Sequence, residues 1–382
     1  MTVHMSSREN AALLNRRRFL TACSSLLALS PEAMAADDAI AAAVRSAIEA
    51  GACPAVQVAL ARDGRTQYSR GFGLADIENR TRLRRNGVFR IGSLSKQFTA
   101  AAAIKLASDQ QLDLDAPIST WLPFMAPLPV TTPLELMHQT SGLRSDETGE
   151  PLAGNPSQID LAQAIASQEQ PFDFPPGEAW LYSNANYIVL GAIIEAVTQK
   201  PLAEALHDLV FAPAGLRRTR MDGDGVVAPH RVTGYSYNEQ GEFVTAAPMA
   251  IAQAGGAGAL LSTADELCQW HRALLGGHLF GASYVELMTA PGRLRDGRLS
   301  GANRFAPEDA SYGEVQYACG LLVSPPDDAN PSLLHFGYID GFSSMLQTYT
   351  RTQLTIAVLC NCDPGPDLPF RSVRAAALAG AL

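Results

Sequence analysis

Segments with strand character stand at both ends of the chain and enclose a long middle part with helical periodicity. The strand-like segments cover 55–61, 67–71 and 88–91 near the beginning, and 317–323, 333–336, 343–350 and 354–359 near the end. Helical patterns cover 37–50, 93–108, 134–138, 161–167, 186–197, 201–210, 264–275 and 370–379. Separate runs of strands and helices are typical of the α+β class. We therefore expect one antiparallel sheet flanked by helices, built from about 54–91 and 315–361, with an inserted mostly helical region at about 108–300.

The composition narrows the class of protein. Of the 382 residues, 47% are hydrophobic and 18% are charged, which is ordinary for a globular enzyme. The formal net charge of −9 argues against a surface that binds nucleic acid. Beyond residue 35, no segment reaches the ~18 consecutive apolar residues that a membrane span needs. We expect a small molecule or a short peptide as substrate, with no nucleic-acid partner and no stable membrane span.

The first 35 residues have the features of an export signal. The stretch Asn15-Arg16-Arg17-Arg18-Phe19-Leu20 is similar to a twin-arginine consensus, an apolar run follows, and Ala33-Met34-Ala35 offers small residues for cleavage. Leu20-Thr21-Ala22-Cys23 imitates a lipoprotein box, but it lies too close to the arginines to follow a full apolar region. The pattern predicts a signal peptide over 1–35, one domain over 36–382, and a periplasmic or secreted location.

Five cysteines follow the predicted signal, and they are scattered. Because their number is odd, Cys53, Cys268, Cys319, Cys360 and Cys362 cannot all pair within the chain. We expect buried small apolar residues, with the last two on one face of a strand. The chain has no His-Glu-x-x-His and no paired Cys-x-x-Cys pattern, so we expect neither a metal nor a cofactor.

Ser93-Leu94-Ser95-Lys96 follows a short apolar strand and opens a helical pattern. Residues three apart on a helix share one face, so the Ser93 hydroxyl and the Lys96 amine can meet. A serine needs a neighbouring base to act as a nucleophile, and a lysine can serve where desolvation or positive charge lowers its pKa. The chain has only three lysines, which makes a chance match uncommon. The alternative is an ordinary helix start, with Ser93 as N-cap and a solvated Lys96.

Two further segments carry polar groups that an acyl-transfer site would need. In an extended loop, Tyr182 and Asn184 would face the same cleft. A tyrosine beside an ammonium ionises more easily and can act as a general base, and an amide can bind a substrate carbonyl. Taken alone, the two are more often a packed ring and a turn residue.

The second segment is His335-Phe336-Gly337-Tyr338, on a predicted edge strand. Gly337 would let a substrate backbone come close. The N–H of Tyr338 could pair with that of Ser93 as an oxyanion hole. A lone histidine is more often structural, so His335 needs its neighbours to support a role.

Ser93-x-x-Lys96, Tyr182-x-Asn184 and His335-x-Gly337 together resemble, in order and rough spacing, the penicillin-recognising serine hydrolases. That superfamily includes class C β-lactamases, D-alanyl-D-alanine carboxypeptidases, D-aminopeptidases and related carboxylesterases. The flanking segments 136–143, 182–191, 254–267 and 341–344 are also similar, so the resemblance covers roughly 40–362. It implies a β-lactamase/transpeptidase-like fold.

The resemblance also implies roles. Ser93 would be the acylated nucleophile, Lys96 would help to deprotonate it, and Tyr182 would be the base or proton shuttle. Asn184 would hold the substrate amide, with Gly337 and Tyr338 beside it. His335 stands where many members have the lysine of Lys-Thr-Gly.

Two departures from the family pattern bear on the substrate. His335 is neutral or only partly charged near neutral pH, unlike a lysine. Phe336 replaces a hydroxyl residue that helps to grip a substrate carboxylate, and we expect its ring to form an apolar wall. Both changes weaken the case for efficient β-lactam hydrolysis. The chain also lacks the Glu-x-x-x-Asn element of class A enzymes, so deacylation through Tyr182 is the better model.

We therefore expect an exported serine hydrolase that acts on small amides or peptides, including those with D-amino acids, or on esters. The alternatives are a β-lactamase and a non-hydrolytic penicillin-binding or sensor module; Tyr182 favours turnover. The segments 145–156 and 291–311 are expected to line part of the pocket, and neither has a pattern that identifies the substrate.

Overall fold

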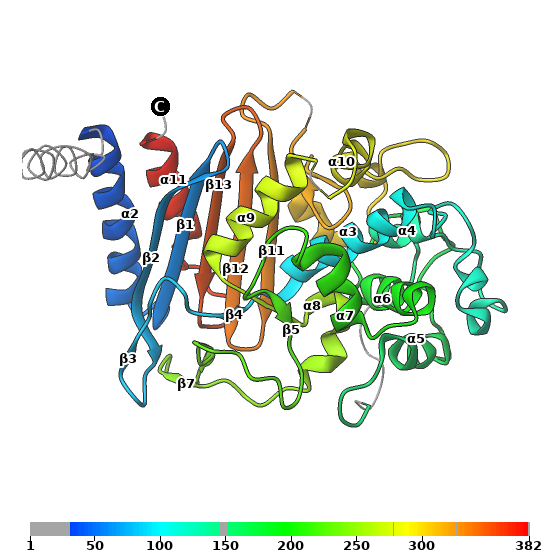
Figure 1. Ribbon diagram of the computed structural model, residues 1–382, viewed down its shortest axis with the longest axis horizontal. Helices are drawn as coiled ribbons and strands as arrows, with labels where there is room; N and C mark the ends of the chain where they lie inside the picture. Colours follow the sequence, from blue (N-terminus) through cyan, green and yellow to red (C-terminus); the bar gives the residue numbers. More distant parts are fainter. Residues whose placement is uncertain (1–30, 145–151, 278, 326, 381–382) are drawn as a thin grey trace, which may run out of the picture.

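A computed structural model describes residues 31–144, 152–277, 279–325 and 327–380 of the chain. An eight-stranded antiparallel sheet lies at its centre, and both ends of the chain contribute to it (Figure 1). β1 pairs with β2 on one side and with β13 on the other, which confirms the α+β class and the shared sheet. In spatial order the strands are β3 (Thr81–Arg82), β2 (Arg65–Asp76), β1 (Ala55–Arg62), β13 (Leu354–Cys360), β12 (Phe342–Tyr349), β11 (Ser332–Ile339), β10 (Leu322–Val323) and β9 (Gln316–Tyr317).

The central strands β1, β13 and β12 are buried on both faces and are mostly apolar, with a few buried polar side chains such as Gln57 and Ser344. In β1, Val56 and Val58 point to one core, whereas Ala59 and Ala61 point to the other. The β1–β2 turn has positive φ at both central residues, 49° at Asp63 and 71° at Gly64. Such turns match the right-handed twist of the strands that they join.

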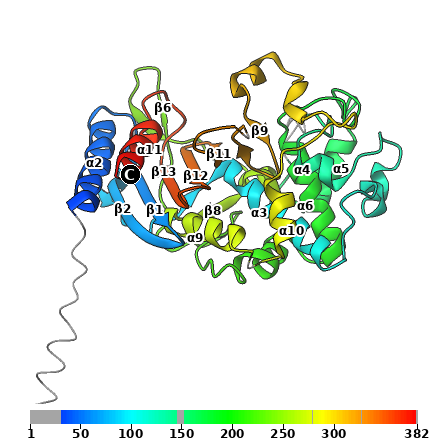
Figure 2. The ribbon, with the colours of Figure 1, turned by 90° about the horizontal axis from the view of Figure 1, so that it is seen from above.

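Two helices from opposite ends of the chain cover the outer face of the sheet. α2 (Pro31–Glu49) and α11 (Phe370–Ala379) pack on each other and on the sheet (Figure 2). Val44 of α2 and Val373 of α11 are fully buried in the outer core that they form with the sheet.

The five described cysteines are buried free thiols, as the sequence predicts. Cys53, Cys360 and Cys362 lie together in the outer core, so the last two do share one face. Cys268 and Cys319 lie in the inner core, between the sheet and the helical region.

The inner face of the sheet carries α9 (Ala264–Leu275) and, beyond it, the helical region (Figure 1). α3 runs through this region and is buried on nearly every side, including Lys96, Gln97 and Thr99. This burial follows because α3 packs against α6, α8 and α10. The helices here are α3 (Ser95–Ser108), α4 (Pro133–Met137), α5 (Gln158–Ala166), α6 (Asn184–Thr198), α7 (Leu202–Leu206), α8 (Gly255–Gly258), α9 (Ala264–Leu275) and α10 (Ala282–Thr289).

Short strands and 3-10 turns complete the fold. β4 (Phe89–Arg90), β8 (Leu260–Ser262) and β5 (Arg220–Met221) form a three-stranded sheet, and β6 (Tyr235–Tyr237) pairs with β7 (Phe243–Thr245). The turns are η1 (Gly92–Leu94), η2 (Ile118–Thr120), η3 (Pro123–Met125), η5 (Ile251–Ala254), η6 (Ser300–Ala302) and η7 (Pro307–Tyr312).

Four predicted elements differ in detail. The strand at 88–91 belongs to the small sheet rather than the main one. The helix predicted from residue 93 begins at Ser95, because Ser93 lies in the 3-10 turn η1. The strand predicted over 317–323 is two short strands, because Gly320, with φ of 75°, turns the chain between them. The helix predicted over 201–210 continues from α7 into a π-helical turn at His207–Phe211.

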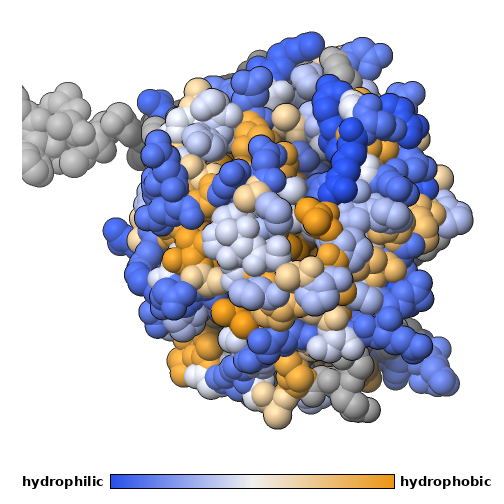
Figure 3. All heavy atoms as spheres, turned by 90° about the vertical axis from the view of Figure 1, so that its right-hand side faces the viewer, coloured by the Kyte–Doolittle hydropathy of each residue, from blue (hydrophilic) through white to orange (hydrophobic). Residues whose placement is uncertain are grey.

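No helix in the described parts of the chain is both long and apolar enough to cross a membrane. On the face shown in Figure 3, apolar residues reach the surface in small patches between hydrophilic side chains. The predicted twin-arginine motif lies outside the described residues, and the predicted cleavage site at Ala33–Ala35 falls within α2.

Candidate active site

The two residues of the Ser-x-x-Lys motif meet where the sheet joins the helical region. Lys96 Nζ lies 3.0 Å from Ser93 Oγ, and Lys96 has no solvent exposure. A buried ammonium is costly unless it is well hydrogen-bonded. Here Asn184 Oδ1 at 2.7 Å and Ala257 O at 3.0 Å are further acceptors. A solvated lysine at an ordinary helix start is therefore excluded.

Two glycines allow η1 and β11 to touch. Gly92 has φ of 51°, and a Cβ on it would lie 2.8 Å from Tyr338 N. A Cβ on Gly337 would lie 2.0 Å from Ile91 O, a distance that no real side chain tolerates. The main chains on either side of Ser93 and Tyr338 thus lie side by side, as a pair of N–H donors for one oxyanion requires.

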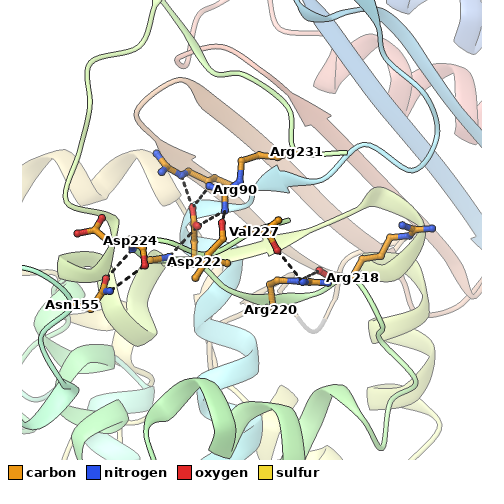
Figure 4. Close-up of polar contacts among 10 residues, drawn as sticks. Arg90, Asn155, Arg218, Arg220, Asp222, Asp224, Val227 and Arg231 are labelled. Carbon is orange, nitrogen blue, oxygen red and sulfur yellow. Dashed lines mark hydrogen bonds and ion pairs between the residues drawn. The ribbon is translucent and has the colours of Figure 1, made fainter. Parts of the chain in front are cut away.

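A buried carboxylate fixes the strand that leads to Ser93. Arg90 of β4 donates from Nε to Asp222 Oδ2 at 2.9 Å, and Arg231 donates from Nη2 to Asp222 Oδ1 at 2.7 Å. Both guanidinium groups point at the Asp222 side chain, which has no exposure (Figure 4). Because Arg90 stands three residues before Ser93, this cluster anchors the approach to the site from outside it.

The carbonyl that binds Lys96 is itself held in place. Thr99 Oγ1 of α3 donates to Gly256 O at 2.7 Å, and Gly256 N donates to Gln158 Oε1 at 2.8 Å. These bonds hold the turn that presents Ala257 O to the Lys96 amine. Sequence reasoning missed Ala257, because a carbonyl ligand leaves no trace in the residue type.

Tyr182 and Asn184 reach the same amine from the other side. Lys96 Nζ lies 4.8 Å from the centre of the Tyr182 ring. Ser183 is extended, as expected, but Asn184 is the first residue of α6 rather than part of a loop. The turn from strand-like to helical backbone still directs both side chains to Lys96.

Gln139 supports this turn from below. Its main-chain oxygen accepts from Leu181 N at 3.1 Å, and its Oε1 accepts from Ser183 N at 3.0 Å and from Asn186 Nδ2 at 2.5 Å. Gln139 is fully buried and has a left-handed φ of 62°. Such strain persists only where surrounding contacts over-determine the backbone. The residue lies in the recognised segment 136–143, but its type alone gave no reason to single it out.

His335 is a neutral, buried side chain. Its Nδ1 lies 2.5 Å from Phe336 O and donates to it, and its Nε2 lies 3.3 Å from the Tyr317 hydroxyl. Burial, and then the positive charge of Lys96, lowers the pKa of His335 to about 3. His335 is therefore neutral near neutral pH, rather than partly charged. Tyr317, which joins His335 to the site, was not predicted.

The expected apolar wall from Phe336 is wrong. The Phe336 ring lies on the outer face of the sheet, 6.0 Å from Phe370 of α11 and 6.3 Å from the Tyr338 ring. Since His335 and Gly337 face the site, alternation along the strand turns Phe336 away from it. Tyr338 likewise contributes its main chain to the site.

No group of three or more His, Cys, Asp or Glu side chains within the described ranges is placed to hold a metal ion. Of the residues predicted for the site, Ser93, Lys96, Tyr182, Asn184 and His335 converge through side chains. Gly337 and Tyr338 join them through the backbone of β11.

A family model described as Beta-lactamase matches residues 40–381. This chain belongs to the β-lactamase family. The match covers most of the chain, and it confirms the resemblance to penicillin-recognising serine hydrolases and the fold that the resemblance implies.

Individual relatives differ in what their names say they act on. Penicillin-binding protein 4* of Bacillus subtilis (strain 168) is 25% identical over 340 residues, which cover 84% of this chain and 70% of that protein. Esterase EstB of Burkholderia gladioli is 35% identical over 175 residues, which cover 41% of this chain and only 44% of that protein. A D-stereospecific amidohydrolase from Streptomyces sp. superposes with a TM-score of 0.72 at 25% identity, covering 90% of this chain and 99% of that one. The chain is thus a hydrolase of the β-lactamase fold.

Proposed function

We propose that this chain is an exported serine hydrolase that works through an acyl-Ser93 intermediate. Its substrates are small amides or peptides, including those with D-amino acids, or esters. The observation that carries the proposal is the buried contact of Lys96 Nζ with Ser93 Oγ and Asn184 Oδ1, beneath the Tyr182 ring. A hydroxyl, an amine and a phenol this close can exchange a proton.

In acylation, Ser93 Oγ attacks the substrate carbonyl carbon, and its proton passes to the Lys96–Tyr182 pair. The bond from that carbon to the leaving nitrogen or oxygen then breaks, and Tyr182 returns the proton to the leaving group. In deacylation, water attacks the acyl-serine, the ester bond to Oγ breaks, and Ser93 regains its proton as the acid product leaves. The leaving group must therefore depart beside the Tyr182 ring.

The remaining residues stabilise charge and orient the substrate. The N–H groups of Ser93 and Tyr338 receive the oxyanion, and preorganised donors of this kind supply a large part of such catalysis. Asn184 holds the substrate amide. The expected role of Gly337 in making room for the substrate is wrong, because the missing Cβ makes room for Ile91 O instead. The substrate backbone lies along the open edge of β11, which pairs with β10 only at residues 333 and 334.

The neutral state of His335 bears on the choice of substrate. A lysine would offer a permanent cation to a substrate carboxylate, and a charge-assisted hydrogen bond is worth about 1.5–3 kcal/mol. Without it, esters and amides with neutral groups should have a higher kcat/KM than β-lactams that bear a carboxylate. Relatives named as an esterase and as a D-stereospecific amidohydrolase are in keeping with ester and amide substrates.

The test is activity on p-nitrophenyl butyrate, D-alanine p-nitroanilide and nitrocefin, with mass spectrometry of the protein during turnover. We expect an acyl group on Ser93, and Ser93→Ala should lower the rate about 10³-fold or more. Ser108→Ala, at the far end of the same helix, is the matched control and should leave the rate unchanged. An adduct on another serine would overturn the proposal. A burst without turnover would indicate the binding or sensor module instead, and a marked preference for nitrocefin the β-lactamase.

Export has its own test, since its support lies in the sequence alone. Replacing both Arg16 and Arg17 by lysine should leave the precursor in the cytoplasm, whereas Arg8→Lys should not. The exported wild type should begin near Ala36, which would also define the domain as 36–382. Normal export of the double variant would contradict the twin-arginine route.

A further inference from the structure

A loop of the helical region is joined to the strand segment that carries Tyr182. Trp180 N donates to Asn303 O, and Phe305 N donates to Trp180 O, both at 2.9 Å. Trp180 stands two residues before Tyr182, so these two hydrogen bonds hold the start of the loop close to the segment that carries the proposed base. In Figure 2 the segment around residues 300–315 rises beside β9 and β11, between the sheet and the helical region.

One guanidinium closes this loop. Arg304 Nη2 donates to Gly313 O at 3.1 Å and to Val315 O at 2.6 Å, across the loop from its own position. The same group lies 5.1 Å from the centre of the Trp180 ring and 5.6 Å from that of Tyr312. Arg304 thus fixes both the main chain at the end of the loop and the ring of Tyr312.

The rings form a continuous series from the loop to the site. Tyr312 packs edge-on against Trp180, with centroids 5.4 Å apart, and Trp180 lies 5.8 Å from Tyr317. Tyr317 in turn lies 6.1 Å from Tyr182. Trp180 and Tyr317 are buried, whereas Tyr312 and Tyr182, at the two ends of the series, are half-buried, so Tyr312 presents its ring to solvent at the loop end.

The electrostatic surroundings of Tyr312 agree with this position. Burial, followed by the charge of Asp309, raises the pKa of Tyr312, and the Tyr338 phenol contributes in the same direction. The ring contacts, rather than these charges, relate Tyr312 to Tyr182: Tyr312 stands at the outer end of the series that runs through Trp180 and Tyr317.

We propose that the loop 304–315, closed by Arg304, forms the wall of the leaving-group subsite, and that Tyr312 selects leaving groups with an aromatic or bulky apolar substituent. Arg304 is a positioning residue that acts through Tyr312. The inference rests on the proposed function, because it is Tyr182 that returns the proton to the leaving group and so brings that group beside this wall.

Two esters with the same acyl part and leaving alcohols of similar basicity test the wall. Benzyl butyrate and methyl butyrate differ in the ring that Tyr312 would contact, and their hydrolysis is followed in a pH-stat. Tyr312→Ala should lower kcat/KM for the benzyl ester about tenfold through KM, the usual scale for one apolar contact, and leave the methyl ester within about twofold. Tyr312→Phe keeps the ring and should behave as the wild type.

Arg304 is tested on the same pair. Arg304→Met removes the donors and the planar stack at similar length, and should reproduce the loss for the benzyl ester through KM with kcat unchanged. Arg304→Lys keeps a donor for the two carbonyls but lacks the flat group that stacks on both rings, so it should restore the preference only in part. A purely structural role would instead lower both esters alike.

The outcomes separate this inference from the proposed function. If acyl-Ser93 forms but Tyr312→Ala changes both esters equally, or neither, the leaving-group wall is wrong and the nucleophile stands. If Ser93→Ala retains activity, the proposed function fails whatever the loop variants do.

Discussion

The two sides of the active site differ in how deeply they are buried and how closely they are packed. On one side, Ser93 and Lys96 lie in buried backbone that glycines allow to pack without a gap. On the other side, the loop with Tyr312 is half-exposed, and Arg304 is the side chain that bonds across it to Gly313 O and Val315 O. A displacement of 1 Å at reacting atoms can cost about 10²-fold in rate, whereas an apolar contact with a substrate tolerates such a shift. The comparison indicates that the residues proposed for the chemistry lie in closely packed backbone, whereas the residue proposed for substrate selectivity lies in a partly exposed loop.

The largest effect should come from the anchor behind the fixed side. Asp222→Asn removes the carboxylate that Arg90 and Arg231 share and should lower the free energy of unfolding by about 3 kcal/mol. This value is at the low end of the range for a broken buried ion pair, because both arginines are partly exposed and can be rehydrated. Denaturant unfolding measures the change. Asp296→Asn, in the exposed pair with Arg298, is the control and should leave the free energy of unfolding nearly unchanged. Equal effects would show that the anchor carries no special weight.

A second prediction addresses the fixed side directly. Gly337→Ala places a Cβ against Ile91 O and must push β11 away from η1, so kcat/KM should fall about 10²-fold. Gly281→Ala adds the same methyl group where nothing lies within 4 Å and should leave kcat/KM unchanged. A Gly337→Ala enzyme with wild-type kinetics would mean that the close packing is dispensable.

Three buried histidines predict how the free energy of unfolding responds to acid. Burial lowers the pKa of His138 to about 4 and that of His271 to about 3, and His335 is likewise near 3. Because the unfolded chain takes up these protons first, the free energy of unfolding should decrease as pH falls below about 6.5, by about 1.4 kcal/mol per pH unit for each histidine. The contribution of the histidines to this decrease should end near pH 3–4.

Denaturant unfolding at several pH values measures this slope. His335→Gln should remove about one third of it if the three sites contribute equally. The kcat/KM profile should show no inflection from His335 between about pH 5 and 8, because the ring stays neutral there. An inflection that His335→Gln abolishes would contradict the neutral state.

The smallest effect on stability belongs to the loop. Tyr312→Ala should change the free energy of unfolding by about 1 kcal/mol or less, because the ring is already half-exposed. The same variant should alter the choice between benzyl and methyl esters. Unfolding and kcat/KM should be measured on one preparation of this variant. A large loss of stability would contradict the view that the loop affects selectivity without supporting the fold.

The site residues that lie close together in the sequence could be predicted from it. Ser93 with Lys96, and Tyr182 with Asn184, stand close in sequence, so their spacing alone identifies the right pairs. Periodicity likewise predicts the helix at 370–379 with the bounds observed. Phe336 is instructive, because strand alternation places its ring on the face opposite to His335, and this follows from the sequence alone.

The residues that escaped prediction act at long range in the sequence. Asp222 meets Arg90 across 132 residues, and Gln139 meets Ser183 across 44. Such contacts have no period and no local signature. Arg304 was missed for another reason: its partners are main-chain oxygens, which every residue possesses.

The pairing of α2 with α11 has a consequence for engineering the chain. α2 begins and α11 ends at the same edge of the sheet, side by side in both views (Figures 1 and 2). A short glycine-rich linker between them would therefore disturb little, and the chain could be opened at the exposed turn Glu239–Glu242 between β6 and β7. Such a circular permutant would keep every strand of the main sheet intact while moving its ends to the β6–β7 turn, which lies at one end of the main sheet, where Tyr237 donates to Ala52 O.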